Sequence, residues 1–305
     1  MTVLVDCQGL SKHFGHKAVL QQLDLQIHVG APVALVGANG AGKTTLLSVL
    51  CGYIQPDHGR VEVLGHQAGS PELSGRLGAL PQDAQFDPDF GLARQLQWLA
   101  RLQGMSVAKS RQETERVLAL VDLTAEAGSK VAQLSHGMRK RLAIAQALLG
   151  EPELVLLDEP TAGLDPLHAK ALRDCIQRLS AHCTFVISSH NLFELEQLCG
   201  TVLMLEQGRI QQQVAQVSQS GVLRLQLCQE NYQPLLPLLE QLPGLVSLRK
   251  VSKLQLELQY DAERAVDFDV LLLQWLHQQG IDYRQLSRGP SLEQQLFQSG
   301  ARPTS

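Results

Sequence analysis

The segment GANGAGKTT, residues 37–45, places three glycines, a lysine and two threonines between two apolar runs. VALV at 33–36 comes before it, and LLSVL at 46–50 follows. From Gly37 to Thr44 the spacing is GxxxxGK[ST], the pattern of a phosphate-binding loop between a strand and a helix. The chain is therefore expected to contain a buried strand that ends at this loop and a helix that begins in it.

Each residue type in the loop suits an anion. Glycines let the backbone turn so that several N–H groups converge on one phosphate, and a helix that begins near Lys43 adds its positive dipole end. The Lys43 ammonium would reach the β- and γ-phosphates of a nucleotide, and the Thr44 hydroxyl would bind Mg²⁺. An ordinary glycine-rich turn is the alternative, but the complete motif between a strand and a helix favours phosphate binding. The residues predicted to contact the nucleotide are Gly37, Asn39, Gly40, Gly42, Lys43, Thr44 and Thr45.

Two adjacent carboxylates follow another apolar run. Residues 154–157 are LVLL, and Asp158 and Glu159 come directly after them. In open α/β sheets, ligands bind at this carboxyl end of the strands. Because consecutive strand side chains point to opposite faces, the two acids are expected to serve different tasks. Asp158 would assist Mg²⁺ and Glu159 would polarise the attacking water; a charged pair that merely ends a strand is the alternative.

A histidine and a glutamine complete the predicted catalytic set. His190 ends the run FVISSH, where a neutral imidazole near the γ-phosphate would donate a hydrogen bond and hold the geometry of the base. A structural histidine is the alternative for this position. Gln82, in LPQD, would bring its amide oxygen to the metal ion or to the water. The predicted catalytic residues are Glu159, His190 and Gln82, and the predicted Mg²⁺ ligands are Thr44, Gln82 and Asp158.

The order of the elements indicates an α/β fold with a mostly parallel sheet. Apolar alternation predicts short strands within residues 1–30, and a helix is expected over 44–54. Residues 92–149 contain three amphipathic helical patterns in succession, and strand-like runs return at 153–159 and 183–189. Strands and helices that alternate in this way, with a helical insert, are typical of α/β domains.

A smaller unit is predicted after a glutamine- and serine-rich seam at 208–221. Its strand and helix patterns follow the order βαββαβ, which is typical of a small α+β, ferredoxin-like domain. We therefore expect domains at 1–215 and 216–305. Ser291 and Gln294 have the spacing of a capping box, so a helix is expected to begin there.

Composition restricts the classes of function. The formal net charge is −4, so the chain lacks the basic field that nucleic-acid-binding proteins usually carry, and no nucleic-acid partner is expected. No basic start precedes an apolar run, and no stretch approaches about eighteen consecutive apolar residues, so neither a signal peptide nor a membrane span is predicted. The six scattered cysteines include no CxxC pair and indicate reduced thiols in the cytosol. A role at a membrane would therefore depend on another chain.

The segment LSHGM, residues 134–138, leads through a helical pattern into LLDEP and AGLD. In this order, over about residues 1–210, the motifs resemble the nucleotide-binding subunit of an ABC transporter. The resemblance implies a P-loop NTPase domain with a mixed sheet core, an antiparallel β subdomain and a helical subdomain, and it implies ATP and Mg²⁺ as cofactors. Phe14 falls where the family stacks an aromatic ring on adenine, and a core phenylalanine is the alternative. Three further positions match the family's Q-loop, D-loop and H-loop, in that order: Gln82, Asp165 and His190.

The resemblance also implies a second chain. In this family two subunits pack head to tail, so Ser135, Gly137 and Asp165 of one chain would complete the site of the ATP that Lys43 of another holds. The pair would be a homodimer or would include a second ABC subunit, and it would tighten with ATP and loosen after hydrolysis. The usual LSGGQ reads LSHGM here, which is similar to ABC-2-type exporters and favours an ATPase that is weaker or that depends on its partner.

The leading hypothesis is an ATPase subunit that drives export through a separate membrane permease, peripheral on the cytoplasmic face of the plasma (inner) membrane. A groove near Gln82 and residues 83–96 would receive a permease helix. The C-terminal domain resembles the accessory domain of ABC-2-type ATPases and would serve dimer contact, regulation or stability. Three alternatives stay open: a soluble ABC ATPase that acts on ribosomes or DNA, a regulatory module with little turnover, and an importer ATPase.

Overall fold

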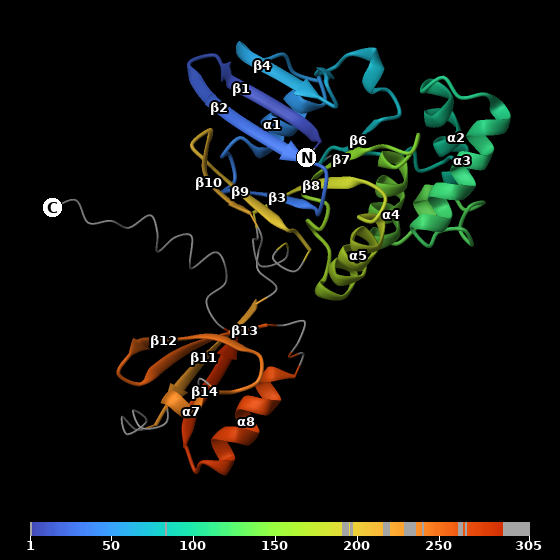
Figure 1. Ribbon diagram of the computed structural model, residues 1–305. Coiled ribbons are helices and arrows are strands. Elements are labelled where there is room, and N and C mark those ends of the chain that lie inside the picture. Colours follow the sequence, from blue (N-terminus) through green and yellow to red (C-terminus); the bar gives the residue numbers. More distant parts are fainter. Residues whose placement is uncertain are drawn as a thin grey trace. The chain divides into compact units, whose positions relative to one another are not determined.

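The computed structural model divides the chain into two compact units, Met1–Ala215 and Gln216–Ser305 (Figure 1). It describes residues 2–288 except 83, 191–194, 196–197, 216–219, 229–235, 240, 262–264 and 266. The helix expected from the spacing of Ser291 and Gln294 lies outside the described residues. Among the helices that the structure does describe, none is both long enough and apolar enough to cross a bilayer.

The larger unit is built around a six-stranded sheet in the order β10-β9-β3-β8-β7-β6. Its strands are β3 (Val33–Val36), β6 (Leu77–Leu80), β7 (Leu154–Asp158), β8 (Thr184–Ser189), β9 (Thr201–Glu206) and β10 (Arg209–Ala215). Neighbouring strands are parallel except β9 and β10, which form an antiparallel hairpin. Every residue of β3, β7 and β8 is buried, as expected for central strands that are covered on both faces. The mostly parallel sheet predicted from the sequence is confirmed.

A second, antiparallel sheet has the order β2-β1-β4-β5 and shares one apolar core with the central sheet and α1 (Lys43–Leu50). Its strands are β1 (Val3–Phe14), β2 (Lys17–His28), β4 (His58–Val63) and β5 (His66–Gln67). The sequence predicts short strands at the start of the chain, but β1 and β2 each have 12 residues. Their pairing shifts register at several places, as between Cys7 and Leu10, so the apolar alternation breaks while the strand continues.

The other helices described in this unit are α2 (Leu92–Leu102), α3 (Val107–Leu120), α4 (His136–Ala147) and α5 (Pro166–Leu179). α2, α3 and α4 contact one another and confirm the three amphipathic patterns predicted between residues 92 and 149. α1 is shorter than the helix predicted over 44–54, because the chain turns at Gly52. This glycine has φ +75, and a Cβ on it would lie 2.1 Å from the Cα of Gly69. The helix therefore ends where another segment passes close to it.

The smaller unit is an antiparallel sheet of four strands in the order β12-β13-β11-β14. Its described elements are β11 (Ser220–Leu227), α7 (Leu236–Leu239), β12 (Leu245–Ser252), β13 (Gln255–Asp261), α8 (Phe268–Gln278) and β14 (Tyr283–Arg288). Leu225 and Leu256 face the same side of the sheet and share a core with Phe268 and Leu272 of α8. The chain order is βαββαβ, so the ferredoxin-like fold predicted from the sequence is confirmed.

Candidate active site

The loop between β3 and α1 contains glycines that other residues cannot replace without a backbone change. Gly37 is buried, and a Cβ on it would lie 2.3 Å from the carbonyl oxygen of Leu205. Gly42 has φ +111, and a Cβ there would lie 3.0 Å from the carbonyl oxygen of Val19. Gly40 also has a positive φ, +82. The loop thus adopts backbone conformations that favour glycine, and α1 begins directly after Gly42.

Lys43, the first residue of α1, has its charged group fixed within this loop. Its ammonium donates to the carbonyl oxygens of Gly37, at 2.7 Å, and Ala38, at 3.4 Å. It also lies 3.5 Å from the Oε1 atom of Glu159, and only 6% of its side chain is exposed. A positive charge therefore stands at the N-terminal end of α1, where the helix dipole also stabilises anions.

Ser188 on β8 holds both carboxylate residues at the end of β7. Its hydroxyl donates to Oδ1 of Asp158 at 2.5 Å and accepts the backbone N–H of Glu159 at 2.9 Å. Glu159 has φ +49, an uncommon value for a residue with a side chain, so the chain turns sharply there. Sequence reasoning missed Ser188. The available signal was a pair of serines, Ser188 and Ser189, at the end of a fully buried strand.

The Glu159 carboxylate joins two other segments of the chain. Its Oε2 atom lies 2.7 Å from Nδ1 of His190, and its Oε1 atom faces Lys43. Only 9% of the Glu159 side chain is exposed, whereas 55% of the His190 side chain is exposed. A buried carboxylate with one partner on each oxygen is fixed in orientation, and such a group can accept a proton from a bound water.

These groups border a cavity of about 500 Å³. From the loop and α1 it is lined by Asn39, Gly40, Gly42, Lys43, Thr44 and Thr45. Further along the chain it is lined by Gln82, Glu159, Ala162 and His190, and from β2 by Lys17 and Val19. The structure thus brings most of the predicted site residues into one cavity, from segments up to half the chain apart. Lys17 and Val19 were not predicted, although their position directly after the turn that follows Phe14 was a signal.

Phe14, Gly37 and Asp158 are not among the described residues that line this cavity. The carbonyl oxygen of Gly37 accepts a hydrogen bond from the Lys43 ammonium, and the Asp158 carboxylate accepts one from the Ser188 hydroxyl. Phe14 ends β1 opposite Lys17, and 51% of it is exposed. Phe14 is therefore not a core residue, and the Lys12 ammonium lies over its ring at 5.6 Å from the ring centre.

Ser135, Gly137 and Asp165 form a second cluster, at the N-terminal ends of α4 and α5. The Ser135 hydroxyl accepts the backbone N–H of Met138 at 3.2 Å and caps α4. The Asp165 carboxylate caps α5, and a hydrogen bond from His168, with Nδ1 at 2.5 Å, lowers the pKa of this carboxyl. Gly137 packs on the same ring, since a Cβ there would lie 2.7 Å from Cδ2 of His168. None of the three belongs to the described lining of the phosphate-loop cavity.

Comparison with known proteins places the chain in a family. The model of the ABC transporter family matches residues 20–162. The Nod factor export ATP-binding protein I of Cupriavidus metallidurans is 34% identical over 212 residues, which are 68% of this chain and 70% of that protein. The chain belongs to the ABC transporter ATP-binding family. The daunorubicin resistance ATP-binding protein DrrA3 of Streptomyces coeruleorubidus is 35% identical to this ABC ATPase, over 68% of this chain and 66% of that protein.

Solved structures of ABC proteins share the fold. An ATP-binding subunit of an ABC transporter has a TM-score of 0.61 and 28% identity, over 70% of this chain and 90% of that one. A nucleotide-free ATP-binding cassette from an ABC transporter has a TM-score of 0.63 and 23% identity, over 70% of this chain and 92% of that one. The predicted fold class is confirmed, and as an ABC ATPase the chain binds and hydrolyses ATP.

Proposed function

We propose that this ABC ATPase powers an ABC-2-type exporter and works with a separate membrane permease, at the cytoplasmic face of the inner membrane. The names of the relatives, for Nod factor export and daunorubicin resistance, support an export role. The observation that carries the proposal is the Glu159 carboxylate, which meets Lys43 and His190 at the cavity of the phosphate loop. A regulatory module with little turnover would not need a proton acceptor in this position.

The residues around the cavity can be assigned roles in hydrolysis. Lys43 would exchange its bonds to loop carbonyls for bonds to the β- and γ-phosphates of ATP. Glu159 would accept a proton from the attacking water, while His190 keeps the carboxylate in place. The exposed ring of Phe14, beside Lys17 of the cavity wall, would stack on adenine.

The oxygen donors of the site suit Mg²⁺. The Thr44 hydroxyl and the Gln82 amide line the cavity, and Asp158 lies directly before Glu159. These are the hard oxygen ligands that Mg²⁺ prefers when it binds a nucleotide. When bound, the ion supplies positive charge that offsets the charge of the phosphates. We therefore assign its protein ligands to Thr44, Gln82 and Asp158.

The separation of the two clusters supports a site shared between two copies of the chain. The Ser135 oxygen accepts the backbone N–H of Met138. The hydroxyl hydrogen is not used in that bond, so it can be donated to an anion. The N-terminal end of α4, where it lies, favours negative charge. We propose that Ser135, Gly137 and Asp165 complete the phosphate-loop cavity of a partner copy. Each ATP would then bridge two chains of a homodimer, and the dimer would loosen once the γ-phosphate is cleaved.

A groove beside α2 and α4 supports the docking of a permease. It has a volume of about 380 Å³ and is lined in part by Tyr53, Leu102 and Gln146. Tyr53 is 66% exposed and Leu102 is 83% exposed, so two large side chains at this groove are open for an amphipathic helix to cover. The sequence predicts docking near Gln82 and residues 83–96, but Gln82 lines the ATP cavity, and none of residues 84–96 is among the described residues that line this groove.

The proposal is tested by joint expression with the permease. Leu102→Glu should prevent the chain from co-purifying with the permease, while phosphate release by the isolated chain stays unchanged. Val29→Glu is a matched control, since Val29 is 56% exposed and does not line the groove. Co-purification of the Leu102 variant at the wild-type level would contradict docking at this groove. A wild-type chain that never associates with a permease would contradict the transport role and favour a soluble ABC ATPase.

A further inference from the structure

His168 lies in the first turn of α5 and orients the residue that caps this helix. Oδ1 of Asp165 accepts the backbone N–H groups of Leu167 and His168, each at 3.1 Å. Oδ2 of the same carboxylate lies 2.5 Å from Nδ1 of the His168 ring, which donates a hydrogen bond to it. Because the capping bonds reach one oxygen only, the bond from the ring fixes the plane of the carboxylate. Both side chains are open to another molecule, since 58% of Asp165 and 51% of His168 is exposed.

The same ring packs against the start of α4. A Cβ on Gly137 would lie 2.7 Å from Cδ2 of His168 and 3.3 Å from its Cγ. Carbon atoms in favourable contact are about 3.5–4.0 Å apart, so any side chain at residue 137 would push the ring away. Glycine at this position therefore leaves the space that the imidazole occupies. Through His168, the carboxylate that caps α5 is joined to a residue of α4.

A second histidine makes a contact in the opposite direction. His136 is the first residue of α4 and takes the place of a glycine in the usual LSGGQ. Its Nε2 atom would lie 3.6 Å from a Cβ on Gly163, in the turn before α5. The start of α4 and the start of α5 thus each place a histidine beside a glycine of the other segment. The two segments interlock through side chains whose positions depend on one another.

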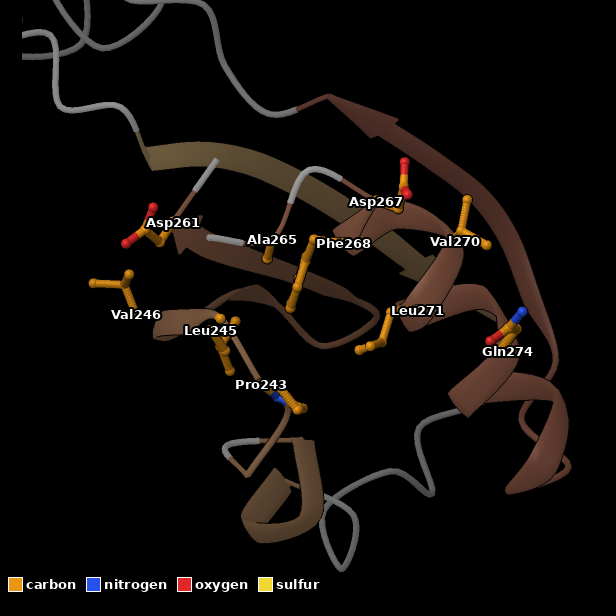
Figure 2. Close-up of a pocket in the computed structure, with 11 residues that line it drawn as sticks. Pro243, Leu245, Val246, Asp261, Ala265, Asp267, Phe268, Val270, Leu271 and Gln274 are labelled. Carbon is orange, nitrogen blue, oxygen red and sulfur yellow. The ribbon is translucent and has the colours of Figure 1, made fainter. Parts of the chain in front are cut away.

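Glycine contacts of this kind differ in what they hold. In the smaller unit, a Cβ on Gly244 would lie 2.4 Å from the Cβ of Ala265, which lines a groove beside α8 together with Phe268 (Figure 2). Ala265 has no polar side-chain atom, so that contact can only pack two segments together. At Gly137 the neighbour is an imidazole that also bonds a carboxylate. A displacement of the α4 segment would therefore move a polar group of the α5 segment.

We propose that His168 is a positioning residue of the ATPase, which holds Asp165 and Gly137 in the arrangement that ATP bound by a partner copy requires. This role rests on the proposed site shared between two copies of the chain, and His168 would act through the two residues without touching the nucleotide. A histidine that only completes the cap of α5 is the alternative. Such a cap needs no partner on α4, whereas the ring of His168 fills the space left by Gly137.

Phosphate release at saturating ATP tests this role. His168→Leu keeps a side chain of similar size but removes the donor. The kcat should fall at least about tenfold, because small displacements of positioning groups cost this much or more. The Kd of ATP for the isolated chain should stay unchanged, since no residue of the phosphate loop is altered.

Two further variants separate the hydrogen bond from other effects. His168→Asn places its amide nitrogen as many bonds from the backbone as Nδ1, so the bond to Asp165 can form and kcat should stay within about threefold of the wild type. His182→Leu is the matched control, because this histidine is exposed beyond the end of α5. Its kcat should change by less than about twofold.

A double-mutant cycle tests the contact between the two helices. Gly137→Ala adds the Cβ that displaces the ring and should lower kcat about tenfold in the otherwise wild-type chain. In a His168→Ala chain that space is empty, so the same change should lower kcat by less than about threefold. Equal losses in both chains would overturn the proposal, because the two residues would then act independently.

Ser135→Arg separates this proposal from the shared site on which it rests. If Ser135→Arg abolishes phosphate release while His168→Leu loses less than about tenfold in kcat, the shared site stands and the role of His168 is refuted. A His168→Asn chain no faster than His168→Leu would also refute it. So would a His168→Leu chain that no longer binds ATP, since the residue would then be structural. If Ser135→Arg keeps the wild-type rate, both proposals fail together.

Discussion

Glu159→Gln tests the assignment of the catalytic base. The substitution keeps the size of the side chain but removes the proton acceptor that lies between Lys43 and His190. A positioned general base typically contributes about 10²–10⁴-fold to the rate. The kcat should therefore fall by this factor, which corresponds to about 2.7–5.4 kcal/mol of activation free energy.

ATP binding should survive the same change. The Oε1 atom of Glu159 lies 3.5 Å from Nζ of Lys43, and at this distance their attraction is about 5 kcal/mol at an effective dielectric constant of 20, before desolvation is counted. Without the carboxylate, Lys43 is free for the phosphates and the cavity carries one negative charge less. The Kd of ATP should therefore stay the same or fall, and an ATP-bound dimer should accumulate.

Phosphate release at saturating ATP measures the first effect, and light scattering of the protein with ATP measures the second. Glu153→Gln is the matched control, because Glu153 precedes the same strand, is 52% exposed and pairs with Arg76 at the surface. Its kcat should change by less than about twofold. A Glu159 variant that turns over within tenfold of the wild type would refute the base assignment, and one that no longer binds ATP would refute the electrostatic argument.

Packing, the second cluster and pH dependence can each be tested by one change. Gly37→Ala should lower the free energy of unfolding by about 1–3 kcal/mol in urea denaturation, since its Cβ would lie 2.3 Å from the carbonyl oxygen of Leu205. Ser135→Arg should abolish phosphate release while the Kd of ATP for the isolated chain stays unchanged; weaker ATP binding would place Ser135 at its own cavity. A hydrogen bond from Lys12 lowers the pKa of the Asp57 carboxyl from 3.8 to about 2, so this group stabilises the fold above pH 3.8 and the contribution is lost as the pH falls to about 2. Thermal denaturation of Asp57→Asn should lack that part of the pH dependence, and an unchanged profile would contradict it.

Local patterns explain why much of the fold and of the site could be predicted. The spacing from Gly37 to Thr44 specifies both the turn and the start of α1, since each residue acts through its own backbone or through the helix that it begins. The LVLL run before Asp158 is a fully buried strand, because continuous apolar sequence suits a parallel sheet covered on both faces. In the smaller unit, apolar and polar residues alternate strictly along β13. This pattern predicts both the strand and which of its side chains are buried.

Contacts between distant segments could not be predicted in the same way. Ser188 holds Asp158 across two neighbouring strands, and the sequence contains no spacing rule for such a pair. Lys17 lines the cavity as the first residue of β2, paired with Phe14 at the end of β1. In the sequence, the apolar alternation breaks at the register shifts, so it does not predict that β1 and β2 extend this far. The end of α1 is set by the close approach of Gly52 to Gly69, which depends on tertiary packing. The features that could not be predicted are therefore those that depend on contacts between segments far apart in the sequence.

Complementation between two inactive variants tests directly whether two chains share each ATP site. Lys43→Ala disables the phosphate loop, and Ser135→Arg disables the cluster that would be offered to a partner. If association is random, half of the dimers in an equal mixture are mixed, and each of these has one intact site out of two. The mixture should then recover about a quarter of the wild-type rate of phosphate release per chain. A mixture that releases phosphate no faster than the sum of the separate variants would contradict a site built from two chains.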